Sequence, residues 1–137
     1  VRGPLKMSQY YVLWDTGSYD YPCMEYLKPS LVPLLQPILK QLGVKDLGRV
    51  LIVNLKPSGH VTKHNDQETY ADHYSRFHIV LRSNQHCSQT CGDELQRFEV
   101  GDVWWFDHTK LHTAHNVGNG TDRIHIIFDC VPTVELQ

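Results

Sequence analysis

The stretch RVLIVNLKPSGHVTKHNDQETYADHYSRFHIVLR, residues 49–82, opens and closes with short apolar runs that are rich in β-branched residues. Runs of this composition, bounded by turn residues such as the PSG at 57–59, are typical of strands. Similar apolar or aromatic runs follow at residues 96–100, 103–106 and 123–130. Many short strands in succession predict an antiparallel sandwich or barrel.

The N-terminal part of the chain has a different pattern. QYYVLW at residues 9–14 predicts an edge strand, and KPSLVPLLQPILKQLG at residues 28–43 predicts a helix, because its leucines recur at helical spacing. Ser30 suits the N-cap of this helix and Gly43 suits its C-terminal end. Pro37 is expected either to kink the helix or to mark its true start. We therefore predict a mainly β fold with an N-terminal helical buttress.

Length and composition favour one globular domain over residues 1–137. We expect residues 1–48 to provide a supporting strand and helix, and residues 49–130 to form the core of a β-barrel. A hydrophobic content of 41% with 20% charged residues is ordinary for a folded chain, which argues against disorder.

The net charge of the chain and the lengths of its apolar runs indicate which partners and which location to expect. A formal net charge of −2 argues against a general nucleic-acid binder, which usually carries a basic face. We find no apolar run near the roughly 20 residues that a membrane helix needs. We also expect no secretory leader. These features predict a cytoplasmic protein without a membrane partner.

The four cysteines, at positions 23, 87, 91 and 130, do not form a strong motif. Cys87 and Cys91 are spaced C-x3-C rather than the C-x2-C of most zinc knuckles, and no second pair completes four ligands. With His86 they form a weak candidate metal site. Free thiols in a reducing cytosol are the favoured interpretation, and a disulfide between Cys87 and Cys91 is the alternative for an exported protein.

His64 and Asp66 form an H-x-D pair, and in an extended segment residues i and i+2 point to the same face. A polar surface loop is the simplest interpretation. A metal site is the alternative, and its third ligand would come from His108, His112 or His115 in FDHTKLHTAHN. Two histidines and one carboxylate form the facial triad of non-haem Fe(II) oxygenases, which leaves open positions for a chelating cosubstrate and dioxygen.

Residues 49–130 resemble the aspartyl/asparaginyl β-hydroxylase family of Fe(II)/2-oxoglutarate dioxygenases. The elements that carry this resemblance follow in the family's order: KPSGHVTKH (56–64), SRFHIVL (75–81), FEVGDVWWFDHTKLHTAHN (98–116) and DRIHIIFD (122–129). The resemblance implies a double-stranded β-helix, the cupin-like jelly roll.

The resemblance also implies the metal ligands. His64 matches the first iron ligand of the family, and His112 matches the second. Animal members have glycine at the position of Asp66, whereas the bacterial relatives that hydroxylate proline are similar to the present H-x-D version. In this chain the predicted catalytic metal set is therefore His64, Asp66 and His112.

For the cosubstrate, Arg76 and His78 match the pair that contacts 2-oxoglutarate near its iron-chelating end. Arg123 matches the arginine that binds the distal carboxylate, a role suited to a forked guanidinium that donates two parallel hydrogen bonds. Asn54 is the nearest candidate for the family's polar helper at that carboxylate. By this resemblance the segment from His64 to Arg76 is longer than in the animal enzymes, and its loop QETYADHY (67–74) is interpreted either as a lid or as an enlarged turn.

The expected activity is therefore hydroxylation with Fe(II), 2-oxoglutarate and O2. The substrate is expected to be an amino acid or an Asp, Asn or Pro side chain in a peptide or protein. Two alternatives stay open: a cupin-type metal enzyme that does not use 2-oxoglutarate, and a non-catalytic metal-binding barrel.

Trp104 and Trp105 are expected to face opposite sides of one strand. The histidines expected to have no role are His60, His73, His86 and His125.

Overall fold

The computed structural model describes residues 8–15, 19–20, 22–67 and 69–136, with side chains described from residue 27 onward. The helices are α1 (Pro22–Leu42) and α2 (Thr69–His73). The strands are β1 (Ser8–Asp15), β2 (Tyr19–Asp20), β3 (Asp46–Leu55), β4 (His60–His64), β5 (Ser75–Arg82), β6 (Cys87–Cys91), β7 (Glu94–Gln96), β8 (Val103–Phe106), β9 (His112–Asn116) and β10 (Arg123–Val131).

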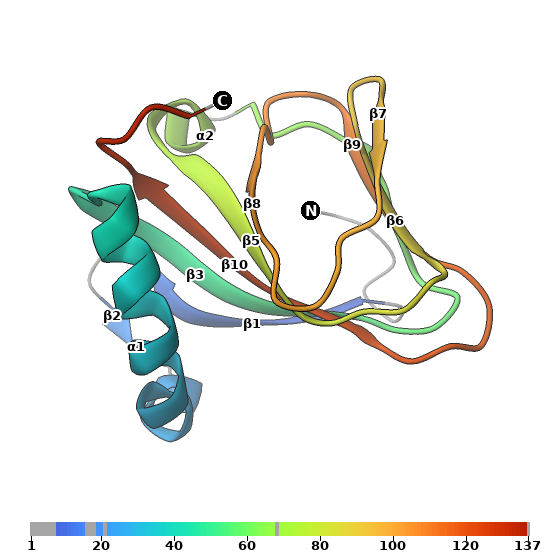
Figure 1. Cartoon of the computed structure of the whole chain (residues 1–137), viewed down its shortest axis with the longest axis horizontal. Helices are drawn as coiled ribbons and strands as arrows, with labels where there is room; N and C mark the ends of the chain where they lie inside the picture. Colours follow the sequence, from blue (N-terminus) through green and yellow to red (C-terminus); the bar gives the residue numbers. More distant parts are fainter. Residues whose placement is uncertain (1–7, 16–18, 21, 68, 137) are drawn as a thin grey trace.

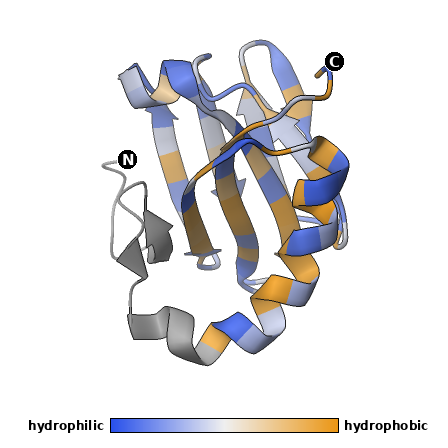
Figure 2. Cartoon of the chain, turned by 90° about the vertical axis from the view of Figure 1, so that its left-hand side faces the viewer, coloured by the Kyte–Doolittle hydropathy of each residue, from blue (hydrophilic) through white to orange (hydrophobic). Residues whose placement is uncertain are grey.

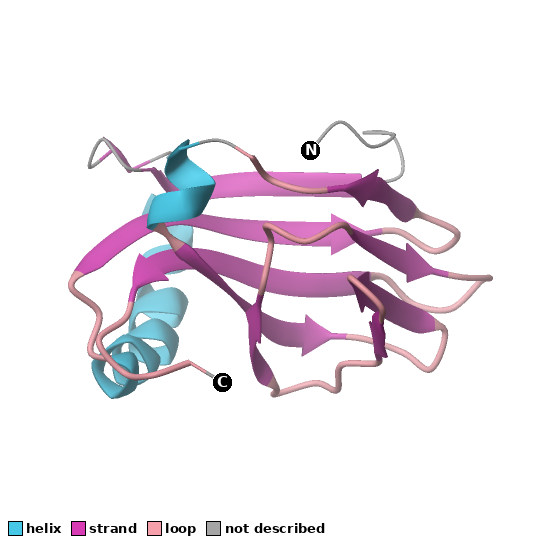
Figure 3. Ribbon diagram, turned by 90° about the horizontal axis from the view of Figure 1, so that it is seen from above, coloured by secondary structure: helices cyan, strands magenta, loops and turns pink. Residues whose placement is uncertain are grey.

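These strands form two antiparallel sheets that face each other (Figure 1). The larger sheet has the strand order β2-β1-β3-β10-β5-β8, and the smaller one has the order β4-β9-β6-β7. Figure 3 shows the long strands lying side by side, with α1 packed near one end of them. From β3 onward the chain passes back and forth between the two sheets, as in a jelly roll. The predicted double-stranded β-helix is therefore confirmed.

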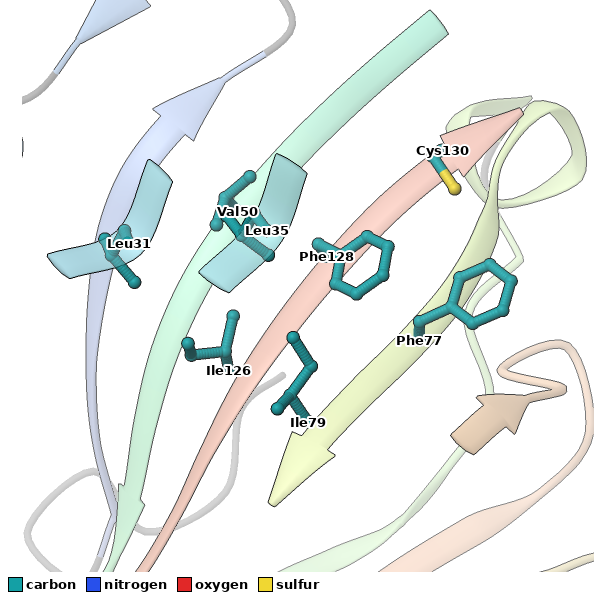
Figure 4. Packing of buried hydrophobic residues seen from close by; sticks show 8 residues of the cluster. All are labelled: Leu31, Leu35, Val50, Phe77, Ile79, Ile126, Phe128 and Cys130. Atoms are coloured by element: carbon teal, nitrogen blue, oxygen red, sulfur yellow. The ribbon is translucent and has the colours of Figure 1, made fainter. Parts of the chain in front are cut away.

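The apolar core lies outside the barrel, between the larger sheet and α1 (Figure 4). On β10, Ile126, Phe128 and Cys130 point toward the helix, because alternate residues of a strand share one face. The buried core members are Leu31, Leu35, Val50, Phe77, Ile79, Ile126, Phe128 and Cys130. Figure 2 shows apolar residues along the strands that lie near α1. The space between the sheets is thereby left to the opposite, more polar face.

The predicted helix is confirmed, but its predicted start at Ser30 is wrong. Helix α1 begins eight residues earlier, at Pro22, and runs through Pro29, Pro33 and Pro37. The three prolines are four residues apart, so they share one exposed face, opposite to the buried Leu31 and Leu35. Pro37 therefore does not mark the start of the helix.

The predicted end of the helix at Gly43 is confirmed. Gly43 has φ +62°, and its amide donates to the carbonyl of Lys40 at 3.1 Å. The Val44 amide donates to the carbonyl of Leu39, also at 3.1 Å. These two bonds form a Schellman cap, in which glycine relieves the steric cost of the left-handed conformation.

The strand predicted at residues 96–100 is wrong for all but its first residue. Residues 97–100 form a loop, in which the Glu99 carbonyl accepts a hydrogen bond from the Asp102 amide at 3.0 Å. The ring of Phe98 instead stacks on Trp104, with ring centroids 4.9 Å apart.

The strand predicted at 9–14 is β1, which has the two-residue β2 outside it. The domain boundaries given above stay a prediction.

No helix in the described part of the chain has the length and apolar character needed to cross a membrane.

Candidate metal centre

The predicted ligand histidines lie opposite each other on neighbouring strands of the smaller sheet. His64 ends β4 and His112 begins β9, and the two residues are partners in the β4–β9 register. Asp66 follows two residues after β4 ends. One ligand atom from each of these three side chains lies within 4.8 Å of the other two. The structure thus brings the predicted triad together, and it is the one such cluster among the described residues.

Hydrogen bonds to the backbone set the protonation of both rings. The Nδ1 atom of His64 lies 2.7 Å from the carbonyl oxygen of Thr62, and the Nδ1 atom of His112 lies 2.7 Å from that of Lys110. A carbonyl oxygen only accepts, so each Nδ1 carries the proton and each Nε2 keeps a lone pair. Burial lowers the pKa of His112, which favours the neutral ring that metals require.

An orphaned atom supports metal binding at this place. The Nε2 atom of His64 is buried and has no hydrogen-bond partner. It lies 3.8 Å from the Oδ1 atom of Asp66. Two imidazole nitrogens and one carboxylate oxygen on one side of a site are a donor set that suits a divalent metal with open positions for other ligands. The residues present therefore fit a metal.

The neighbouring histidines of FDHTKLHTAHN are not among these ligands. His108 is buried beside Asp66, with its Nε2 atom 2.9 Å from the Ala71 carbonyl and its Nδ1 atom 3.5 Å from the Asp66 Oδ2. His115 lies on the opposite face of β9, where its ring stacks on that of His60 with centroids 6.1 Å apart. His115 is three residues beyond His112, an odd offset that places the two side chains on opposite faces of β9, and His108 precedes the strand.

The C-x3-C motif forms neither a metal site nor a disulfide. Cys87 and Cys91 lie at opposite ends of β6, about 13 Å apart at a rise of about 3.3 Å per residue. Both are free, as is Cys130. His86 is exposed. The side chain of Cys23 lies outside the described residues.

Arg123 is a buried cation in a small pocket between the sheets. Its side chain is 4% exposed, and its Nε and Nη1 atoms have no hydrogen-bond partner. Burial lowers the pKa of Arg123 to about 10. The pocket is lined by Ser83, Cys87, Ser88, Gln89, Gln96, Phe98, Arg123 and His125. A buried charge without a partner is costly, so this arrangement favours an anionic ligand.

His78, the second predicted cosubstrate contact, is paired with another histidine. Its Nδ1 atom lies 3.0 Å from the Nδ1 atom of His125, and both rings are almost fully buried. Burial lowers the pKa of both rings well below the usual value, and the charge of Arg123 lowers them further. The two neutral rings therefore share one Nδ1 proton between them.

Arg76, the third predicted cosubstrate contact, is bound by carboxylates of the chain itself. Its Nε and Nη2 atoms donate to the two oxygens of Asp129, at 2.7 and 2.9 Å. Its Nη1 atom donates to the Oδ2 atom of Asp66, at 3.1 Å. Its contact with a cosubstrate stays a prediction.

Several residues of the site escaped the sequence analysis. His125 was expected to have no role, and Asp129 and Gln89 were not considered. The alternation of side chains along β10 could have indicated His125 and Asp129, because both share the inner face of the strand with Arg123. No comparable signal marks Gln89, whose Oε1 atom is buried in the Arg123 pocket without a partner. Asn54 donates to Asp122 at 3.0 Å and does not line that pocket.

Comparison with known proteins agrees with this fold and finds a family model that matches the chain. The family model described as Aspartyl/Asparaginyl beta-hydroxylase matches residues 9–132, which extends the match into the N-terminal part of the chain. An L-proline cis-4-hydroxylase of Rhizobium meliloti (strain 1021) is 27% identical over 78 residues. That match covers 57% of this chain and 28% of the relative, so the chain spans a minor part of the relative's length.

Solved structures share the fold at low sequence identity. The Cupin_2 domain of an XRE family transcriptional regulator from Enterobacter cloacae has a TM-score of 0.55 and 12% identity, and the match covers 92% of this chain and 98% of that one. An HTH_3 family transcriptional regulator from Vibrio cholerae has a TM-score of 0.55 and 8% identity, with 92% and 52% covered. These likenesses identify the fold as a cupin jelly roll.

Proposed function

Because the chain belongs to the aspartyl/asparaginyl β-hydroxylase family, we propose that it is an Fe(II)- and 2-oxoglutarate-dependent dioxygenase that hydroxylates an unactivated C–H bond. The observation that carries this proposal is the cluster of His64, Asp66 and His112 together with the unpaired, buried Arg123. The Arg123 pocket is connected to the cluster through aromatic rings, because its His125 pairs with His78, and the ring of Phe106 contacts both His78 and His112. A metal triad alone fits many cupin enzymes. A triad with a buried cation in the same barrel interior fits a dicarboxylate cosubstrate in particular.

In this proposal the triad holds the metal through three named atoms. His64 and His112 offer their Nε2 lone pairs, because their Nδ1 protons are bound to carbonyls, and Asp66 offers Oδ1. The chemistry supplied by Fe(II) when bound is the oxidation of 2-oxoglutarate to succinate and CO2 by O2, with the second oxygen atom inserted into the substrate C–H bond. The protein's own part is to orient both organic reactants and to exclude water from the space between the sheets.

Arg123 recognises the distal carboxylate of 2-oxoglutarate. Its Nε and Nη1 atoms have no partner in the protein, so both edges of the guanidinium have a donor free for the ligand, and burial makes a charge-assisted pair stronger there than in water. The neutral His78–His125 pair nearby adds no competing charge, so Arg123 is the cation available in this pocket. The two rings leave one Nε2 donor and one Nε2 acceptor for the remaining polar atoms of the ligand.

The substrate class is an amino acid, free or within a peptide or protein, with Asp, Asn and Pro as the candidate residues. The partial match to an L-proline hydroxylase supports a proline substrate. A net charge of −2 gives no support to a nucleic-acid partner. We place the protein in the cytoplasm, which the three free thiols among the described side chains support.

The test is turnover with iron, 2-oxoglutarate and oxygen in the presence of free and peptide-bound proline, aspartate and asparagine. Succinate measured by NMR reports the cosubstrate reaction even when it is uncoupled from hydroxylation. His112→Ala is expected to abolish succinate formation, whereas His115→Ala, on the opposite face of the same strand, is expected to preserve it. An iron-loaded protein that neither binds nor decarboxylates 2-oxoglutarate would instead be a cupin enzyme of another kind or a non-catalytic barrel.

A further inference from the structure

Asp66 lies outside the strand that carries His64, so the β-ladder does not fix its side chain. Strand β4 ends at His64, and Asp66 has one backbone tie to its surroundings, an amide hydrogen bond of 3.0 Å to the carbonyl of His108. A metal ligand on such a loop needs a partner that orients it. We propose that Arg76, anchored by Asp129, is the positioning residue that fixes Asp66 as the third metal ligand, an inference that rests on the metal centre proposed above.

The geometry of Arg76 divides its guanidinium between two carboxylates. The Nε and Nη2 atoms donate to Asp129, and the remaining Nη1 atom donates to the Asp66 Oδ2 at 3.1 Å. A guanidinium is planar and rigid, so fixing one edge on Asp129 also fixes the direction of the third nitrogen. With Oδ2 bound, Oδ1 is the oxygen of Asp66 that faces the His64 Nε2, at 3.8 Å. Arg76 thus selects which oxygen the metal receives.

Asp129 is itself held in place from behind. It is 1% exposed, and Arg76 and Asp129 are paired residues of β5 and β10 in the larger sheet. The Tyr70 hydroxyl donates to the Asp129 Oδ2 at 2.8 Å and accepts from the Arg49 amide at 2.8 Å. Burial raises the pKa of Tyr70, which keeps this hydroxyl protonated as a donor. The loop carboxylate is therefore tied through Arg76 to the rigid sheet.

The pKa of Arg76 agrees with a guanidinium that is held in one place. Burial alone would lower the pKa of Arg76, but its hydrogen bonds to Asp129 and the charges of Asp129 and Asp66 outweigh burial and raise it. The guanidinium is therefore permanently charged and bound on both sides. Replacing Arg76 removes its contacts with both carboxylates and leaves the buried Asp129 without its guanidinium partner. A double-mutant cycle with Asp66 is therefore needed to separate an effect on the metal from an effect on the fold.

A double-mutant cycle on Co(II) affinity, measured without 2-oxoglutarate, tests the inference. Arg76→Gln is expected to weaken Co(II) binding about tenfold or more, as is typical when a residue that orients a metal ligand is lost. In an Asp66→Ala background the same substitution is expected to have no effect, because Arg76 acts through Asp66. The Co(II) absorption spectrum should change in Arg76→Gln and not in Arg82→Gln, an exposed arginine of the same strand that serves as the control.

Each outcome decides the inference. Equal Co(II) affinity in the wild type and Arg76→Gln overturns it while leaving the proposed function intact. An equal loss with and without Asp66 also overturns it, because Arg76 would then support the fold alone. If the wild type binds no Co(II), both the inference and the proposed function, which needs the metal centre, are wrong. If Arg76→Gln does not fold, Arg76→Lys keeps a positive charge for Asp129 without the third nitrogen arm, and the same cycle is run with that variant.

Discussion

Replacing Arg123 by methionine should stabilise the metal-free, ligand-free protein and at the same time abolish 2-oxoglutarate binding. The side chain is buried, with two nitrogens lacking a partner. Burial lowers the pKa of Arg123 from its ordinary 12.5 to about 10. At about 1.36 kcal/mol per pKa unit, the folded environment disfavours the charged guanidinium by about 3 kcal/mol. Methionine is unbranched and apolar and ends near the position of the Arg123 Nε atom, so it removes this cost.

The gain is measured by urea denaturation of the free protein. We expect the free energy of unfolding to rise by up to about 3 kcal/mol, the full value applying only where methionine fills the space without strain. The same variant should show no 2-oxoglutarate binding by calorimetry, while its Co(II) affinity stays unchanged. The thermal stabilisation that the cosubstrate gives to the wild type, which follows from mass action, should vanish.

Arg82→Met is the matched control, because Arg82 is exposed and its charge is already hydrated. It should leave both unfolding and 2-oxoglutarate binding unchanged. A loss of stability in Arg123→Met would refute the reasoning, since it would mean that the guanidinium is satisfied within the protein. Retained cosubstrate affinity would move the carboxylate site away from Arg123.

Three further predictions concern the metal, the buried histidine pair and the helix cap. Asp66→Ala and Asp66→Gly should lower Fe(II) affinity and nearly abolish hydroxylation, and Asp66→Glu should misplace the ligand oxygen and impair turnover severely; near-wild-type succinate production in Asp66→Ala would mean a two-histidine site. The pKa values of His78 and His125 are low in the folded state, so below pH 6.5 the unfolded chain binds more protons than the folded chain. The free energy of unfolding should therefore fall as the pH decreases. The slope is at most about 2.7 kcal/mol per pH unit, which is twice the 1.36 kcal/mol of a single group. The double variant His78→Gln/His125→Gln should lose that part of the pH dependence in urea titrations, and an unchanged slope would argue against the buried neutral pair. Gly43→Ala should destabilise by more than about 1 kcal/mol in the same assay, because an added Cβ meets the C-terminal segment as well as an unfavourable φ of +62°; Gly118→Ala, with φ +83° and open space around it, should cost less.

The order of the motifs predicted the fold, whereas the choice of His112 over His108 and His115 as the third ligand came from the resemblance to the family. The H-x-D spacing placed His64 and Asp66 on one segment, and the charge at the start of an apolar strand marked Arg123. Alternation along β10 places Asp129 and His125 on the same face as Arg123, but their pairing with Arg76 and His78 depends on the register between β10 and β5, which no local pattern contains. Strands β6 and β9 carry polar residues toward the barrel interior, so they lack the apolar alternation by which strands are recognised.

The alternation along β5 and β10 has a consequence for how this protein tolerates change. Phe77 and Ile79 pack against α1, while Arg76 and His78, their immediate neighbours in sequence, face the site. The side of the sheet that holds the chain folded contributes none of the groups proposed for chemistry. Inward-facing side chains can therefore be exchanged with little loss of hydrophobic burial, which makes the barrel interior a place where evolution or a designer can install a new ligand set or substrate preference on an unaltered frame.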